Sequence, residues 1–145
     1  MIEFHERLDY LAKQLRQLLE ADAIRYREWP PENTAHLRNA AGVYHFFRID
    51  NEAKTSLYVG KATVSTAGWS LYKRMAQHFQ PSQRNALAGL LARTQKITGL
   101  EAVESLRKQN VFVQWLCIPE DEGQSAVASF ENFAKSVLQP KYTKE

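Results

Sequence analysis

Two short apolar segments separated by a polar turn constrain the fold of this chain most strongly. Residues 42 to 49 are rich in β-branched and aromatic side chains, which favour extended strands. Residues 50 to 54 are polar turn formers, and residues 55 to 59 resume the strand pattern. We therefore predict that the two segments pair as a hairpin. Strand alternation gives one face with Tyr44, Phe46 and Arg48, and another with Val43, His45, Phe47 and Ile49.

Helical patterns flank this hairpin on both sides. Residues 2 to 21 repeat apolar side chains at spacings of three and four, which predicts an N-terminal helix. Pro30 and Pro31 break any continuation of it. Beyond the hairpin we predict helices over residues 69–79, 84–97, 101–108 and 125–138, and a third strand over residues 111–118. The order of elements indicates a small α+β domain, with a lead-in over residues 1–40 and a core over residues 41–145.

Three features of the sequence lead to further expectations about burial and contacts. The N-terminal helix is either a lid on the core or a dimer contact, with Leu11 and Leu15 in its apolar stripe. In the last helix we expect a buried stripe with Glu131 at its edge. Cys117 is the only cysteine, which excludes an internal disulfide, and its apolar surroundings predict a buried structural thiol. The expected stripe of the last helix consists of Ala126, Phe130, Ala134 and Val137.

The composition is that of a soluble globular protein. The chain has 145 residues, of which 44% are hydrophobic and 24% charged, enough for one domain with a genuine core. Its net charge of +3 is mildly basic, which favours contact with phosphates without requiring a nucleic-acid partner. No stretch approaches 18 consecutive apolar residues, and the start lacks the apolar core of a signal peptide. We expect a cytoplasmic protein without a membrane partner.

Four short motifs, in order along the chain, resemble those of the GIY-YIG nuclease superfamily. Gly42-Val43-Tyr44 and Tyr58-Val59-Gly60-Lys61 are conservative versions of the two strings that name it. Arg74, with His78 four residues later, and then Glu131, with Pro140 nine residues later, follow in the family's order. The second and third motifs look much like the nuclease domain of the bacterial excision-repair incision subunit. They are also similar to homing and restriction endonucleases of the superfamily.

The resemblance implies a three-stranded antiparallel sheet flanked by helices, and a DNA endonuclease that uses Mg²⁺ or Mn²⁺. Glu131 would then be the metal ligand, because Mg²⁺ keeps most of its waters and takes few protein ligands. Arg74 would bind the phosphate with its planar guanidinium. Either Tyr44, with His78 as its partner, or His78 itself would be the general base, with Lys61 stabilising a tyrosinate. Tyr58 would orient the scissile phosphate, and Gly42 and Gly60 would support the site.

Thr143 departs from the family pattern, which has asparagine shortly after the proline. We expect an asparagine there to support the metal position, so we predict that Thr143 leaves a working site with a reduced cleavage rate. The alternatives are a weakened domain that binds nucleic acid without cutting it, and an interaction protein with coincidental motifs. Within the nuclease interpretation, a compact restriction-type enzyme acting as a homodimer through the N-terminal helix is favoured over a repair incision subunit, which normally carries a separate DNA-recognition domain.

Overall fold

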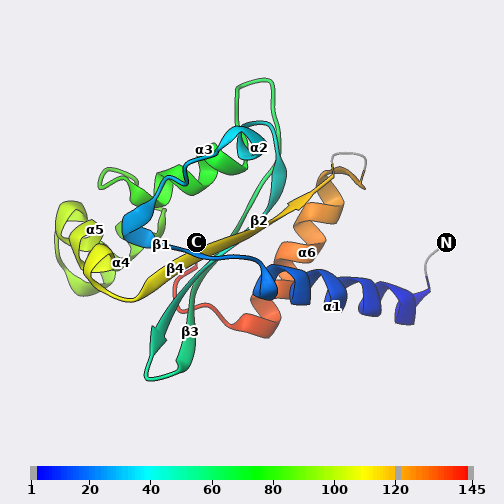
Figure 1. The fold of residues 1–145 in the computed structure, drawn as a ribbon, viewed down its shortest axis with the longest axis horizontal. Coiled ribbons are helices and arrows are strands. Elements are labelled where there is room, and N and C mark those ends of the chain that lie inside the picture. The colour runs from blue at the N-terminus through cyan, green and yellow to red at the C-terminus, as the bar shows by residue number, and fades with distance from the viewer. Residues whose placement is uncertain (1–2, 120–121, 144–145) are drawn as a thin grey trace.

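A four-stranded antiparallel sheet with helices on both faces forms the centre of the computed structural model, which describes residues 3–119 and 122–143 (Figure 1). The strands are β1 (Ile24–Arg25), β2 (Ala41–Asp50), β3 (Ala53–Ala62) and β4 (Val111–Ile118). The helices are α1 (Phe4–Glu20), α2 (Ala35–Arg38), α3 (Leu71–Ala76), α4 (Leu87–Gln95), α5 (Gly99–Lys108) and α6 (Gly123–Leu138), with 3-10 turns η1 (Tyr26–Glu28) and η2 (Gln77–Phe79). The predicted α+β class and the N-terminal helix are confirmed.

The sheet has the order β1-β4-β2-β3, so that β2 lies between the other two long strands. The three predicted strands are present, and β1 is a fourth that was not predicted. Its two residues pair with Val113 and Phe112 of β4. Two residues are too few to show strand alternation, so β1 is defined by its partner strand rather than by its own sequence.

The hairpin between β2 and β3 turns through Asn51 and Glu52, whose φ angles of 49° and 72° are both positive. Two such residues between paired strands match the right-handed strand twist. Farther along, the register shifts between Phe46 and Phe47, because Phe46 pairs with Tyr58 and Phe47 with Ser56. This bulge inserts Leu57 as an extra residue, so Tyr58 and Tyr44 share one face of the sheet.

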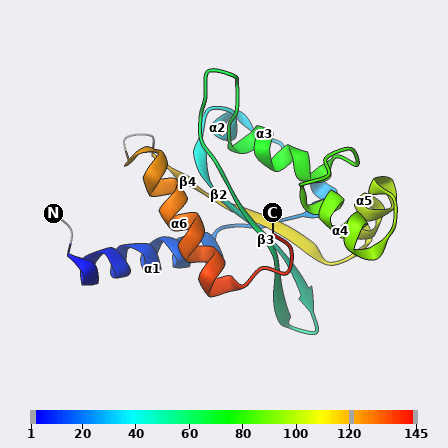
Figure 2. The ribbon, with the colours of Figure 1, turned by 180° about the vertical axis from the view of Figure 1, so that it is seen from behind.

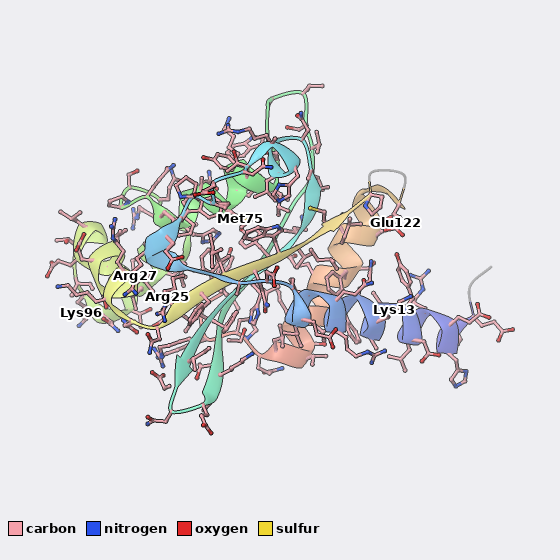
Figure 3. The ribbon with its side chains drawn as sticks, in the orientation of Figure 1. Lys13, Arg25, Arg27, Met75, Lys96 and Glu122 are labelled. Carbon is pink, nitrogen blue, oxygen red and sulfur yellow. The ribbon has the colours of Figure 1, made fainter. Side chains whose placement is uncertain are left out.

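The two faces of the sheet bury separate apolar clusters. One cluster gathers side chains of α3, α4, α5 and η1 around Tyr44, Phe46 and the fully buried Met75, which Figure 3 labels. The other packs α1 and α6 against Val43 and Val59. The predicted alternation of β2 is therefore confirmed, since Tyr44 and Phe46 belong to the first cluster and Val43 to the second.

The N-terminal helix is only partly a lid. Leu15 and Leu18 are buried against the sheet and α6, as a lid requires. The first turns extend beyond α6 (Figure 1), and there Phe4 is 91% exposed and Leu8 55% exposed. The apolar stripe of α1 thus continues past the edge of the domain that covers its second half. Leu15 is consequently a core residue, and a dimer contact on this helix would involve Phe4 and Leu8.

A buried polar network joins the end of α1 to the sheet. Gln114 donates from Nε2 to the carbonyl oxygens of Leu19 and Ala21, at 3.3 and 3.1 Å. Its Oε1 therefore accepts from Nδ1–H of His45 at 2.9 Å, and His45 Nε2 accepts from the hydroxyl of Ser56 at 2.9 Å. Burial lowers the pKa of His45, so that the histidine is neutral in the folded protein.

Two predictions of burial were wrong. Cys117 is exposed, because the sheet face on which it lies extends past the helices that cover Val111 and Val113. In α6, Val137 is exposed and Ala126 only half-buried. The buried stripe of this helix is rotated by one residue and includes Glu131. Its members are Val127, Phe130, Glu131 and Ala134.

Within the described ranges, none of the helices combines the length and the apolar character needed to cross a bilayer. Residues before 41 contribute to the same sheet and the same core as the rest of the chain, through β1, Tyr26 and Leu37.

Candidate active site

A cleft of about 380 Å³ lies beside β3, the edge strand of the sheet. In Figure 2 this strand runs between α6 on one side and α3 and α4 on the other. The cleft is lined by all six side chains that the motifs single out for catalysis, although they come from β2, β3, α3, η2 and α6. These residues are Tyr44, Tyr58, Lys61, Arg74, His78 and Glu131.

Gly60 allows the phenol of Tyr44 to reach this cleft. The two residues are directly paired in the β2–β3 ladder, and the Tyr44 ring lies across the backbone of Gly60. A Cβ atom at position 60 would come within 2.8 Å of Cε2 of Tyr44 and closer still to its hydroxyl. Any larger residue would therefore displace the phenol, which is a physical reason for glycine in the second motif.

The neighbouring histidine has a defined tautomer. Its Nδ1 accepts a hydrogen bond from the backbone N–H of Leu87 at 2.8 Å, where α4 begins. Burial lowers the pKa of His78 to about 3, so the ring is neutral and carries one proton. That proton is on Nε2, which lies 2.7 Å from the hydroxyl oxygen of Tyr44. His78 thus donates a hydrogen bond to Tyr44, and neither ring nitrogen has a free lone pair for a substrate proton.

Tyr44 and Tyr58 form a stacked pair at the floor of the cleft, with ring centroids 6.2 Å apart. Burial raises the pKa of Tyr44 well above its ordinary value, and the nearby Tyr58 and Glu131 raise it further, while Arg74 lowers it. Burial likewise raises the pKa of Tyr58 to about 12. Both phenols are therefore protonated near neutral pH unless additional positive charge enters the cleft.

Glu131 extends from the buried face of α6 into the cleft and is only 8% exposed. A carboxylate on the apolar face of a helix costs free energy, so its position there calls for a partner. Lys135, one helical turn later, provides a cation 3.6 Å from Oε2. The pairing of a glutamate with a lysine four residues later can be seen in the sequence, but Lys135 belongs to none of the four motifs.

Arg74 is held over an aromatic platform. Its guanidinium carbon lies 4.1 Å from the centroid of the Trp69 ring, and Ser70 caps α3 by accepting from the backbone N–H of Lys73. The stacking leaves the edge of the guanidinium available for a bidentate contact with a phosphate. Lys61, at the end of β3, is exposed and adds a second positive charge at the mouth of the cleft.

Gly42 and Thr143, the two supporting positions outside the cleft, have different surroundings. At Gly42 a Cβ atom would come within 3.1 Å of Cα of Cys117, so this glycine allows β2 and β4 to approach each other. Thr143 is not brought to Glu131. It is exposed and lines a second cavity with Arg93 and Lys141. Thr143 therefore lies outside the lining of the cleft that contains Glu131, and its weakening of the metal position stays a prediction.

Polar residues that the motif analysis missed complete the cleft wall. Two of the five, Gln83 and Asn85, come from the segment between η2 and α4, which carries no recognisable pattern, so only the three-dimensional structure identifies them. The five residues are Thr63, Gln77, Gln83, Asn85 and Lys135.

The residues of the cleft fit a divalent ion of the Mg²⁺ type. Within the described ranges, no three His, Cys, Asp or Glu side chains gather around one point, so Glu131 would be the single carboxylate ligand. Mg²⁺ commonly binds one or two carboxylates and retains several waters. The cleft volume leaves room for such waters, and the amide oxygens of Gln77 and Asn85 can accept hydrogen bonds from them.

Comparisons of this chain with known protein families, with curated proteins and with solved structures found no match. A functional assignment therefore depends on the residues and geometry of the cleft.

Proposed function

We propose that this chain is a metal-dependent DNA endonuclease of the GIY-YIG type, which hydrolyses phosphodiester bonds in the cleft beside β3. One observation carries the proposal. Six residues selected by a family pattern, and distributed over almost 90 positions of sequence from Tyr44 to Glu131, line one cleft of about 380 Å³. A coincidental set of motifs would have no physical reason to converge in this way.

Phosphate binding falls to the cations of the cleft. Arg74 offers a rigid pair of N–H donors, and Lys61 adds a point charge, so that the negative charge of the phosphorane is neutralised as it develops. When bound at Glu131, Mg²⁺ or Mn²⁺ would stabilise charge on a phosphate oxygen and on the leaving 3′ oxygen. Tyr58, which lines the cleft, would orient the phosphate through its hydroxyl.

The hydrogen bonds favour Tyr44 over His78 as the group that accepts the proton of the attacking water. The lone pairs of His78 are unavailable, and its Nε2–H points at the Tyr44 oxygen, where it stabilises a phenolate. Ionising even an ordinary phenol at pH 7 requires roughly 4 kcal/mol. Arg74 lowers the pKa of Tyr44, and Lys61 and the bound metal ion would contribute in the same direction. In the reaction, Tyr44 would first lose its own proton to solvent. The water oxygen would then bond to phosphorus as the water proton passes to the Tyr44 phenolate, while the bond from phosphorus to the 3′ oxygen breaks and that oxygen takes a proton from solvent.

Each chain has one such cleft, so cutting both strands of a duplex in one event requires a second copy. We place that dimer contact on the exposed Phe4 and Leu8 of α1. The charges suit an antiparallel pair, because residues 3–11 carry three acidic side chains and one arginine, whereas residues 12–20 carry two basic side chains and one glutamate. A compact restriction-type enzyme is the role that we favour.

Incubation of supercoiled plasmid with the purified chain tests the function. We expect nicked and linear products with Mg²⁺ or Mn²⁺, and intact plasmid in a parallel sample with EDTA. Binding of plasmid in a gel shift without cleavage over a range of both metals would contradict the proposal and favour a domain that only binds nucleic acid.

A further inference from the structure

A second cavity, of about 320 Å³, lies between α4 and the segment that follows α6. Arg93 comes from the last turn of α4 and Lys141 from the C-terminal segment, so two cations of distant sequence position converge on it. None of its lining residues is acidic. The full lining is Leu90, Arg93, Thr94, Lys141, Tyr142 and Thr143.

The cavity wall is rigidly positioned. The backbone N–H groups of Lys141 and Tyr142 donate to the carbonyl oxygens of Ser56 and Leu57 at 3.0 and 2.9 Å, so this segment runs along the open edge of β3. Tyr142 is buried in the core cluster next to α4. The two cations therefore lie on fixed backbone, and both side chains are exposed.

A hydrogen bond connects this cavity to the candidate active site. Nη2 of Arg93 donates to Oδ1 of Asn85 at 3.5 Å, and Asn85 lines the cleft that contains Tyr44 and Glu131. Arg93 and Asn85 thus link the walls of the two cavities, and each cavity carries cations, Arg74 and Lys61 in the cleft and Arg93 and Lys141 in the second cavity. Four cations divided between two linked cavities suit a ligand with several charges along its length, such as a polynucleotide backbone, better than a single small anion.

We infer that the second cavity binds a phosphodiester of the same nucleic-acid strand, a short distance along the strand from the phosphate in the cleft. Arg93 and Lys141 are the residues that contact it. This inference rests on the proposed function, because it assigns the path of the substrate that the cleft would cut. It explains how the domain could hold a strand in register with Glu131.

The test is the binding of fluorescently labelled oligonucleotides to the full chain in EDTA, where no cleavage is expected, at several salt concentrations. In the variant R93A/K141A, we expect the Kd for a 20-nucleotide duplex to rise about ten-fold or more. The slope of log K against log salt should fall by about 0.9, since one phosphate contact on duplex DNA is lost.

The matched control is R27A/K108A, which removes the same charges from the exposed Arg27, labelled in Figure 3, and from the exposed Lys108 at the end of α5. We expect it to behave like the unchanged chain. Equal losses in both double variants would show that only net charge matters, and would overturn the inference. So would a Kd for inorganic phosphate that depends on Arg93 and Lys141 while the oligonucleotide Kd does not, which would indicate a site for a small anion.

Metal-dependent cleavage of plasmid by the unchanged chain separates the two proposals. If cleavage is observed and R93A/K141A binds the long duplex normally, the path through the second cavity is wrong and the proposed function stands. If the unchanged chain neither cuts nor binds nucleic acid, both proposals are wrong.

Discussion

The hydroxyl oxygen of Tyr44 lies 2.7 Å from Nε2 of His78, and the opposite ring nitrogen of that histidine accepts the backbone N–H of Leu87. This chain of hydrogen bonds fixes the direction of donation from histidine to tyrosine. On the mechanism that we propose, the phenol oxygen, once ionised, rather than the imidazole would therefore accept the proton of the attacking water.

Tyr44→Phe should lower the single-turnover cleavage rate by about 10²- to 10⁴-fold, the usual contribution of a general base. Because His78 acts through Tyr44, His78→Ala should cost nearly as much alone but little more once Tyr44 is already phenylalanine. A double-mutant cycle under conditions in which all four proteins are folded measures this coupling. Additive losses would instead show that the two side chains act independently.

Stability should fall as the pH drops below about 6.5. The pKa values of His45 and His78 are both lowered on folding, that of His78 to about 3, so the unfolded chain binds more protons. The contribution of the two histidines to the free energy of unfolding is fully present at pH values above their pKa in the unfolded chain. It is lost as the pH falls toward their lower pKa values in the folded chain.

Urea unfolding at a series of pH values measures this dependence. The two histidines together should give a slope of up to about 2.7 kcal/mol per pH unit. His45→Gln should reduce the slope relative to the unchanged chain, whereas the exposed His36→Gln should not. Parallel curves for all three proteins would contradict the assignment of buried neutral histidines.

Arg74→Lys should be nearly as damaging to cleavage as Arg74→Ala, because charge is retained while the bidentate geometry and the stacking on Trp69 are lost. Lys73→Ala is the matched control. Its ammonium lies over the same Trp69 ring, at 4.8 Å from the centroid, but Lys73 does not line the cleft. Near-normal turnover of Arg74→Lys in single-turnover assays would mean that Arg74 serves only as a general positive charge.

The proposed dimer contact predicts opposite effects for substitutions in the two halves of α1. F4S/L8S should remain folded, because both side chains are exposed, and should elute as a monomer that nicks one strand of a plasmid. Leu15→Ser should unfold the domain, with a loss of about 2 to 5 kcal/mol from its buried position. If light scattering shows the unchanged chain to be monomeric at micromolar concentration, the dimer proposal is wrong.

Elements with strong periodicity were predictable from the sequence. The strand at Val111–Ile118 agrees residue for residue with the prediction, because its apolar run is bounded by a polar turn and a proline. The faces of β2 followed from simple alternation. Burial at the ends of elements was not predictable, since Cys117 and Val137 are apolar residues whose exposure depends on where covering helices stop.

The members of the cleft were predictable only through the resemblance of their motifs. Periodicity alone placed Glu131 at the edge of a stripe, whereas the structure places it within the buried face of α6. The partner of His78 is a backbone N–H at the start of α4, which no side-chain pattern encodes. Asn85 likewise reaches the cleft from a segment without regular structure.

We propose that metal-dependent cleavage depends on Glu131. Glu131→Gln keeps the shape of the side chain and removes its charge, so the fold should be retained while the Mg²⁺ ligand is lost. Glu104→Gln, an exposed carboxylate on α5, is the matched control.

The most direct measurement is single-turnover plasmid cleavage by these two variants and the unchanged chain across a Mg²⁺ titration, with melting temperatures recorded alongside. We predict that Glu131→Gln melts near the unchanged chain, still binds DNA and shows no cleavage above the EDTA background at any Mg²⁺ concentration, while Glu104→Gln cuts normally. A folded Glu131→Gln variant that cuts at the unchanged rate and with the same Mg²⁺ midpoint would contradict it.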